Sequence, residues 1–323
     1  MTNREPLHSR IVGTLVEAMY HGGATLGELH PGARPERHGV VRHDSIAYRR
    51  SGLGAHHLDV YRPQQAESAP VVFYVHGGGF RFMTRRTHWL MGLAFARKGY
   101  VTVNIDYRLA PEHPFPAALV DTCHAYQWVC QNIGEYGGNP SEIIVAGESA
   151  GANLALNLAL ASCQRRTEAW MRRVYDCGTV PRAAILACGI LEVRRPRRFR
   201  RNIDDLPEWL YHRIAEVSRD YLGPSPLCDD TCLQLADPLC VLEALDAPDR
   251  PLPPVFAPCG TADPLLDDTR RLERALQRLD VPVDARYYDG EVHAFHALLW
   301  RQQARQCWRH IYDFLDDHAP VSR

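Results

Sequence analysis

Short apolar runs alternate along the chain with longer segments of helical periodicity, and this alternation restricts the possible folds more than any other feature. Residues 71–75 are apolar throughout, which is typical of a strand that is covered on both faces. Strands separated by helical segments predict an α/β fold, with a mostly parallel sheet and helices on both sides. The predicted strands are Leu58–Tyr61, Val71–Val75, Val101–Ile105, Ile143–Ala146, Ala183–Ala187, Val255–Pro258 and Val283–Tyr288.

Several of the intervening segments predict helices. Residues 150–161 are apolar nearly all round, which indicates a buried helix. The segment Asp267-Asp268-Thr269 resembles an N-cap cluster, because such side chains accept hydrogen bonds from the free N–H groups of a first turn. The predicted helices are Ala117–Asn132, Ala150–Ala161, Asp268–Leu279 and Gln302–Phe314.

Two stretches fall outside the alternation of strands and helices. Residues 1–45 look helical and then turn-rich, and residues from about 190 to 235 form a long insertion between two predicted strands. Ligands of such sheets bind beyond the carboxyl ends of the strands, where insertions usually become lids. We therefore expect one catalytic domain over residues 46–323, covered by a cap that residues 1–45 and the insertion build together.

The composition excludes several classes of partner and site. With a formal net charge of -1, the chain as a whole favours neither nucleic acid nor an anionic membrane. No apolar run reaches the roughly 18 residues of a membrane span, and the polar N-terminus does not resemble a signal peptide, so we expect a cytoplasmic protein. The ten cysteines are expected to be reduced, and the pair Cys228 and Cys232 has no second pair with zinc-site spacing, so no metal site is predicted.

The pentapeptide Gly147-Glu148-Ser149-Ala150-Gly151 stands between a predicted strand and a predicted helix. A strand that turns at once into a helix forces its central residue into a strained conformation, and the flanking glycines keep neighbouring atoms from colliding. Such a turn exposes the serine hydroxyl. We therefore predict that Ser149 is a nucleophile.

A serine hydroxyl needs a histidine to take its proton and a carboxylate to orient that histidine. His293 follows the last predicted strand through a glycine turn, and we predict that it is the base, with His296 as the alternative. Asp263 stands on a turn after the preceding strand, where Pro264 keeps it out of a helix. We predict Asp263 as the orienting acid, since Asp267 and Asp268 are better explained as helix caps.

The segment His76-Gly77-Gly78-Gly79-Phe80 directly follows the predicted strand 71–75. Glycines allow the main chain to approach a substrate and to direct N–H groups at a developing oxyanion. A phosphate-binding loop is the alternative, but no Walker lysine and no GxGxxG spacing accompany it. Gly22-Gly23 lacks a preceding strand and is interpreted as a chance likeness.

Four segments, taken together, resemble the hormone-sensitive-lipase-like esterases: His76-Gly77-Gly78-Gly79, Gly147-Glu148-Ser149-Ala150-Gly151, Asp263-Pro264-Leu265 and His293-Ala294-Phe295. Residues 107–112 strengthen the likeness, which covers roughly residues 57–315. The resemblance implies an α/β-hydrolase fold with an eight-stranded, mostly parallel sheet and a helical cap. It also implies a serine carboxylesterase that hydrolyses short- to medium-chain acyl esters through an acyl-enzyme, without a cofactor.

The resemblance assigns roles residue by residue. It implies Ser149 as nucleophile, His293 as base and Asp263 as the acid that orients it. The oxyanion donors that it implies are Gly78, Gly79 and Ala150. Two departures leave these roles intact: Glu148 stands where the family usually has Asp or Thr, and Ala152 replaces a common glycine.

Other functions stay open on the sequence. The same triad serves amide hydrolases and deacetylases, and a hydrolase scaffold can also serve as a binding protein. The sequence also leaves open whether the chain forms a homodimer. The run Arg194–Arg201 could attract nucleic acid, although a solvated face explains it better. Trp209, Tyr211 and Tyr221 could line an acyl pocket or pack in the core. With a histidine base of ordinary pKa, activity should rise through about pH 6 to 7.

Overall fold

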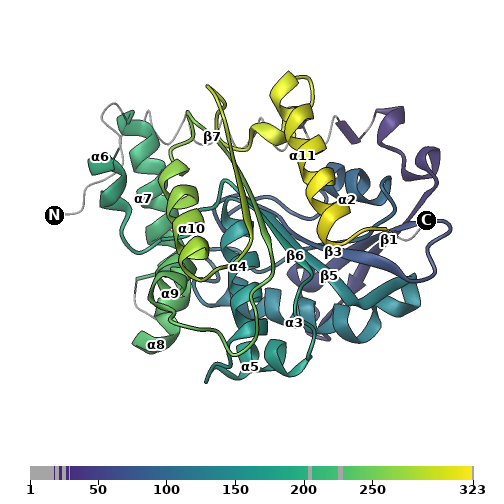
Figure 1. Ribbon diagram of the computed structural model, residues 1–323, viewed down its shortest axis with the longest axis horizontal. Helices are drawn as coiled ribbons and strands as arrows, with labels where there is room; N and C mark the ends of the chain where they lie inside the picture. Colours follow the sequence, from purple (N-terminus) through teal and green to yellow (C-terminus); the bar gives the residue numbers. More distant parts are fainter. Residues whose placement is uncertain are drawn as a thin grey trace.

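A single sheet of eight strands forms the centre of the computed structural model, which describes residues 18, 22–23, 27–28, 30–202, 206–224 and 228–321 (Figure 1). The strand order is β1-β2-β4-β3-β5-β6-β7-β8. Strand β2 runs antiparallel to both of its neighbours, and all other pairs are parallel. The strands are β1 (Val40–Ala47), β2 (His57–Pro63), β3 (Ala69–Val75), β4 (Val101–Ile105), β5 (Gly138–Glu148), β6 (Ala183–Ala187), β7 (Val255–Gly260) and β8 (Val283–Tyr288). The predicted mostly parallel α/β sheet is confirmed.

Strand β1 was not predicted. It is an edge strand with several half-buried or exposed side chains, and a bulge between His43 and Ile46 interrupts its register with β2. It therefore lacks both the continuous apolar run and the regular alternation that identify a strand in sequence. Residues 40–45, which we assigned to the N-terminal cap segment, belong to the sheet. Most of residues 1–29 of that segment lie outside the described residues.

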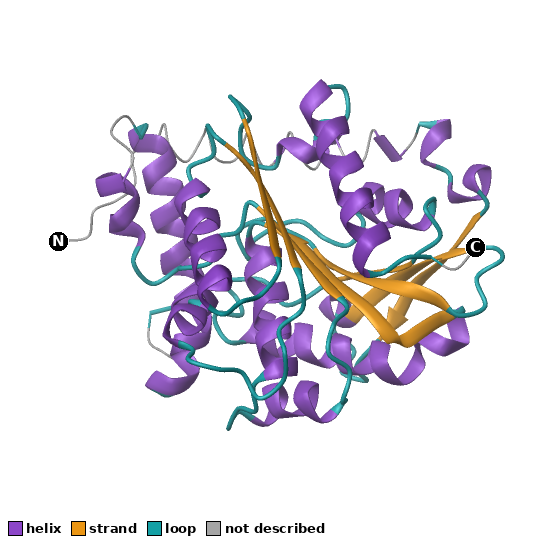
Figure 2. Ribbon diagram, in the orientation of Figure 1, coloured by secondary structure: helices purple, strands orange, loops and turns teal. Residues whose placement is uncertain are grey.

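Helices cover both faces of the sheet (Figure 2). They include α2 (Trp89–Ala96), α3 (Ala117–Asn132), α4 (Ala150–Cys163), α5 (Ala169–Asp176), α10 (Leu266–Arg278) and α11 (Gln302–His318). Residues 71–75 of β3 are apolar because helices cover both faces of this strand. Val72 and Tyr74 pack against α2 and α11, whereas residues 71, 73 and 75 pack on the side of α3, α4 and α10. Helix α3 has the predicted bounds, and the other three predicted helices are present with slightly different ends.

The insertion between β6 and β7 is helical in the part that the structure describes. It contains α6 (Phe199–Asn202), α7 (Glu208–Leu222), α8 (Asp230–Leu233) and α9 (Pro238–Ala244). It therefore extends past the predicted end near residue 235. None of the described helices is both long and apolar enough to cross a membrane.

Asp268 fastens the start of this insertion to α10. Its carboxylate accepts the N–H group of Leu191 at 2.9 Å and pairs with Arg198 at 2.5 Å. The prediction that Asp267 and Asp268 cap their own helix is therefore wrong. The N-cap is Leu265, both aspartates lie in the first turn, and the buried Asp268 side chain serves the neighbouring segment instead.

The parallel strands bring the predicted site segments to one edge of the sheet. Val75 at the end of β3 is in register with Gly147 of β5, and Glu148 is in register with Ala187 at the end of β6. Gly260 at the end of β7 is likewise in register with Tyr288 of β8. The loops that follow these strands therefore emerge side by side, as expected for a ligand site of a parallel sheet.

Candidate active site

Ser149 occupies the sharp turn between β5 and α4. Its backbone has φ 53° and ψ -116°, a region that residues with a side chain rarely adopt. A Cβ atom at Gly151 would collide with the carbonyl oxygen of Val75, and one at Gly147 would collide with the backbone of Gly151. The Ser149 N–H group donates to the carbonyl of Ala187 at 2.9 Å. The two glycines and the neighbouring strand thus hold the serine in its strained conformation, at the N-terminus of α4.

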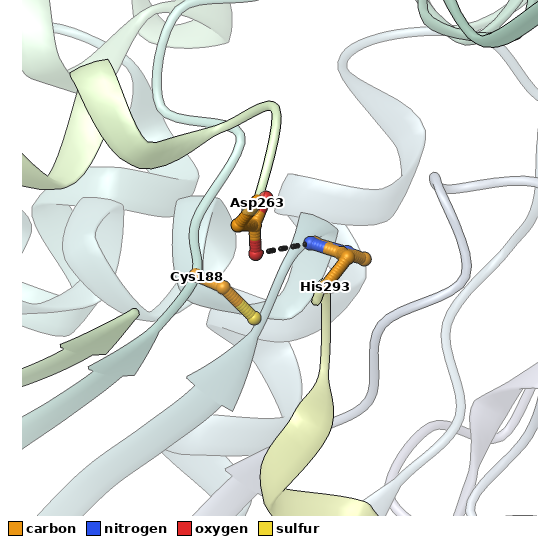
Figure 3. A group of neighbouring side chains, drawn as sticks. All are labelled: Cys188, Asp263 and His293. Atoms are coloured by element: carbon orange, nitrogen blue, oxygen red, sulfur yellow. Dashed lines mark hydrogen bonds and ion pairs between the residues drawn. The ribbon is translucent and has the colours of Figure 1, made fainter. Parts of the chain in front are cut away.

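Asp263 and His293 come from the loops after β7 and β8, and the structure brings them together (Figure 3). Nδ1 of His293 donates to Oδ2 of Asp263 at 2.8 Å. Oδ1 of the same carboxylate accepts the N–H group of Leu265 at 2.8 Å, which fixes the acid in place. Asp263 is buried, while His293 keeps 35% of its side chain exposed. With Nδ1 as the donor, Nε2 of the neutral ring is free to accept a proton.

The electrostatics of this pair favour the charged form of the histidine. Burial alone would lower the pKa of His293, but the carboxylate of Asp263 outweighs it and holds that pKa well above the usual range of histidine. Asp263 thus stabilises the imidazolium that would form on proton transfer.

The alternative residues lie elsewhere. His296 is buried, and its Nε2 lies 2.7 Å from Oε2 of Glu148 rather than near Asp263. Asp268 is engaged by Arg198 and by backbone N–H groups, as described above. The geometry therefore supports His293 and Asp263 over His296 and Asp268.

The glycine-rich segment after β3 folds into a loop of positive φ angles. Gly78 has φ 97° and Gly79 has φ 58°, and a Cβ at Gly78 would also collide with the carbonyl oxygen of Phe82. The hydroxyl of Tyr107 donates to the carbonyls of His76 and Gly77 at 3.0 and 3.3 Å. Tyr107 therefore supports the main chain of this loop, in line with the structural role expected for its segment.

The N–H groups predicted to bind an oxyanion have no acceptor among the described residues. These are the N–H groups of Gly78, Gly79 and Ala150. The Gly78 and Gly79 groups belong to the loop after β3, and the Ala150 group opens α4, whose N-terminus carries partial positive charge. Free donors of this kind can stabilise an oxyanion next to Ser149.

Glu148 takes part in a buried network that the sequence did not reveal. Its Oε1 lies 2.7 Å from Nε2 of His88, and its Oε2 lies 2.7 Å from Nε2 of His296. Burial would raise the pKa of Glu148, but the two histidines hold it well below its usual range. His88 lies shortly after the glycine-rich loop, and His296 lies shortly after His293. We call Glu148, His88 and His296 the Glu148 network. It joins three loops of the site.

Helix α7 packs on the glycine-rich loop. The side chain of Val217 stands directly against Gly79, since a Cβ there would lie 2.8 Å from it. The ring of Tyr221 stacks on Phe80 with 3.6 Å between centroids, and Arg81 pairs with Glu216 at 3.1 Å. Tyr221 therefore packs in the core. Core packing was one of the two alternatives for this side chain, the other being the lining of an acyl pocket.

The arginine run is solvated on one side and paired on the other. Arg194, Arg195, Arg197 and Arg200 are exposed, as the solvated-face interpretation predicts, whereas Arg198 is half-buried. Ion pairs with carboxylates neutralise much of the charge of this run. The pairs are Arg194 with Asp237, Arg195 with Glu192, Arg198 with Asp268 and Arg200 with Glu208.

Comparison with known proteins gives a consistent result. Residues 72–297 match the model of a family described by its α/β hydrolase fold. The chain is 33% identical to an acetyl esterase of Salmonella typhi over 245 residues, which cover 73% of this chain and 68% of that relative. It is 45% identical to the carboxylesterase NlhH of Mycobacterium tuberculosis over 98 residues, but this match spans only 30% of this chain and 31% of that relative.

A solved structure extends the comparison to the whole fold. The crystal structure of an esterase from the bacterial hormone-sensitive lipase family superimposes with a TM-score of 0.71 at 25% identity. The superposition covers 94% of this chain and 90% of that structure, so it includes both the sheet and the insertion between β6 and β7.

Proposed function

The chain belongs to the α/β hydrolase fold family, in its hormone-sensitive-lipase-like group, and from this premise we propose that it is a serine carboxylesterase for short- to medium-chain acyl esters. The observation that carries the proposal is the hydrogen bond from His293 to the buried Asp263, beside the strained turn at Ser149. Relatives named as esterases support the same reaction class.

In the proposed mechanism, Oγ of Ser149 attacks the ester carbonyl while Nε2 of His293 takes the hydroxyl proton. Asp263 holds the ring in the tautomer that leaves Nε2 free and stabilises the resulting imidazolium. The N–H groups of Gly78, Gly79 and Ala150 stabilise the tetrahedral oxyanion.

The intermediate collapses as His293 returns the proton to the alcohol, which leaves an acyl group on Ser149. A water molecule then attacks the acyl-enzyme, again with His293 as base. This second step releases the carboxylic acid and restores the hydroxyl of Ser149.

The cap in this proposal is the helical insertion between β6 and β7, because α7 lies against the glycine-rich loop. Val217 stands so close to Gly79 that an added Cβ would lie 2.8 Å from its side chain, and Tyr221 of the same helix stacks on Phe80. This packing places the insertion against the proposed oxyanion loop, as the cap assignment requires.

The ten cysteines are free in the structure, which suits a reducing compartment such as the cytoplasm. The proposed substrate of the site is a small-molecule ester.

A chain-length series tests the proposed function. We expect turnover of p-nitrophenyl esters to be greatest between acetate and the medium chains and to fall toward palmitate, with matched p-nitroanilides hydrolysed more slowly. A fluorophosphonate probe should stop turnover and attach to Ser149, as mass spectrometry of the labelled peptide would show. Inactivation with the label on another residue would contradict the proposal.

The pH dependence of activity tests the environment of His293. Only the neutral ring can accept the serine proton, so kcat/KM should rise as the ring loses its charge. Because Asp263 holds the pKa of His293 well above its usual range, we expect the rise at higher pH than the 6 to 7 predicted from an ordinary histidine. A midpoint at or below about pH 6.5 in the profile of kcat/KM would contradict this arrangement.

A further inference from the structure

Cys188 is a buried thiol beside the proposed acid and base that the proposed mechanism does not use. It directly follows β6, is only 1% exposed, and has φ 40°, a conformation that is strained for any residue with a side chain. Its N–H group donates to the carbonyl of Pro258 in the neighbouring strand β7 at 3.0 Å. The backbone is thus held in a conformation that fixes the direction of the thiol.

That direction is toward the acid and the base. Figure 3 shows the sulfur of Cys188 facing the carboxylate of Asp263 and the ring of His293. One donor atom from each of the three side chains lies within 4.8 Å of the other two. Burial raises the pKa of the Cys188 thiol, which favours the neutral thiol, and Cys188 acts together with Asp263 to raise the pKa of His293. The cysteine is therefore compatible with an active triad.

Sulfur, imidazole nitrogen and carboxylate oxygen are together the ligand set of borderline-soft divalent cations such as Zn²⁺. Three protein ligands with a fourth, open position are the usual number for an accessible zinc site. His293 keeps 35% of its side chain exposed, so the cluster borders solvent at this ligand. Harder ions such as Mg²⁺ prefer oxygen ligands and should be excluded.

From this geometry we infer that Cys188, Asp263 and His293 form an inhibitory site for a thiophilic divalent cation of the Zn²⁺ class. The inference rests on the proposed function only for its inhibitory consequence, because binding itself requires only the three donors. The metal takes the place of the proton between Nδ1 of His293 and Oδ2 of Asp263.

The protons balance as follows. The thiol of Cys188 releases its proton to solvent and binds the metal as a thiolate. Starting from the neutral ring, the metal displaces the Nδ1 proton of His293 to solvent, and Nε2 takes one proton from solvent. Together with the thiol proton, binding therefore releases one proton overall. A ring protonated at Nε2 cannot accept the hydroxyl proton of Ser149, which makes the metal an inhibitor even without a contact to the serine.

Metal binding can be measured apart from activity. Titration of the purified protein with Cd²⁺ should produce an ultraviolet thiolate-to-metal absorption band, part of which disappears in Cys188→Ala. The difference between the two proteins is the readout, because other cysteines can also bind Cd²⁺. Alanine keeps the Cβ atom, so the variant experiences the same backbone strain at this position as the wild type. Cys163→Ser, which changes a buried cysteine at the end of α4, is the matched control and should keep the full band.

Inhibition provides the second arm. Zn²⁺ should inhibit hydrolysis of p-nitrophenyl acetate reversibly, with recovery on addition of EDTA, and Mg²⁺ should not. In Cys188→Ala the half-inhibiting Zn²⁺ concentration should rise at least about tenfold, since even the loss of an outer partner weakens metal sites by that much. Inhibition of each protein is measured relative to its own turnover without metal.

Two results would overturn the inference: an unchanged Cd²⁺ band in both Cys188→Ala and Cys188→Ser, or unchanged Zn²⁺ inhibition of both variants. If the wild type showed no esterase activity but lost the Cd²⁺ band with Cys188→Ala, the proposed function would fail while the metal site would stand.

Discussion

Ser149→Ala is expected to lower kcat for p-nitrophenyl acetate by about 10⁶, because without the hydroxyl no acyl-enzyme can form. The residual rate should come from the oxyanion donors and from substrate binding, which alone give about 10³ to 10⁴ over water. Steady-state kinetics at saturating substrate measure this loss. Ser162→Ala is a matched control within the same helix, since Ser162 is buried and its hydroxyl contacts only groups of that helix, the carbonyl of Ala159 at 2.8 Å and the sulfur of Cys163 at 3.6 Å. It should keep turnover within about twofold, in line with the small effect of one neutral hydrogen bond.

Asp263→Asn extends this test to the orientation of the base. The amide can donate to Nδ1 of His293, which would leave the proton on Nε2, and kcat should fall by about 10⁴ as it does for this change in other serine hydrolases. Combined with Ser149→Ala, it should cause almost no further loss, because residues that act as a unit are not additive. Losses that multiply in the double variant would show that the two residues do not belong to one triad.

The parts of the fold that the sequence predicted well are those in which local pattern and tertiary environment agree. Strands β4, β6 and β8 have the predicted bounds because each is a short run with clear limits. Strand β1 was missed because its partial exposure and its bulge erase the pattern. Asp268 was misassigned because a local rule for helix caps competes with long-range acceptors, and only the folded chain shows that Leu191 and Arg198 engage its carboxylate.

The same distinction applies to the site. The pairing of Asp263 with His293 could be predicted because each lies in the loop after a strand, and neighbouring parallel strands bring such loops together. The Glu148 network could not, since His88 lies 60 residues from Glu148 and no motif marks the pair. One signal was present: Glu148 departs from the residue types usual for the family at that place, and it stands next to the nucleophile. A carboxylate buried at the end of a strand requires a partner, which is a reason to search for histidines in adjacent loops.

Replacing Glu148 should affect both stability and turnover. In Glu148→Ala, His88 and His296 lose a buried carboxylate, and breaking a buried ion pair in this way costs about 3 to 5 kcal/mol. Thermal or urea unfolding measures that cost. Glu142→Gln is the matched control, since Glu142 lies on the same strand and is only half-buried. It should change the free energy of unfolding by no more than about 0.5 kcal/mol.

The kinetics of Glu148 variants show whether the Glu148 network positions the reacting groups or only stabilises the fold. The Glu148 network holds the loop after the oxyanion glycines, the turn at Ser149 and the loop that carries His293, so its loss should displace groups that act only in the transition state. We therefore expect a lower kcat with little change in KM for Glu148→Gln, which keeps the shape but not the charge. Glu148→Asp keeps the charge but is one methylene shorter and cannot span the same distance between the two histidines; it should fall between Glu148→Gln and the wild type. A raised KM with unchanged kcat in both variants would show that the network supports substrate binding rather than the position of the reacting groups.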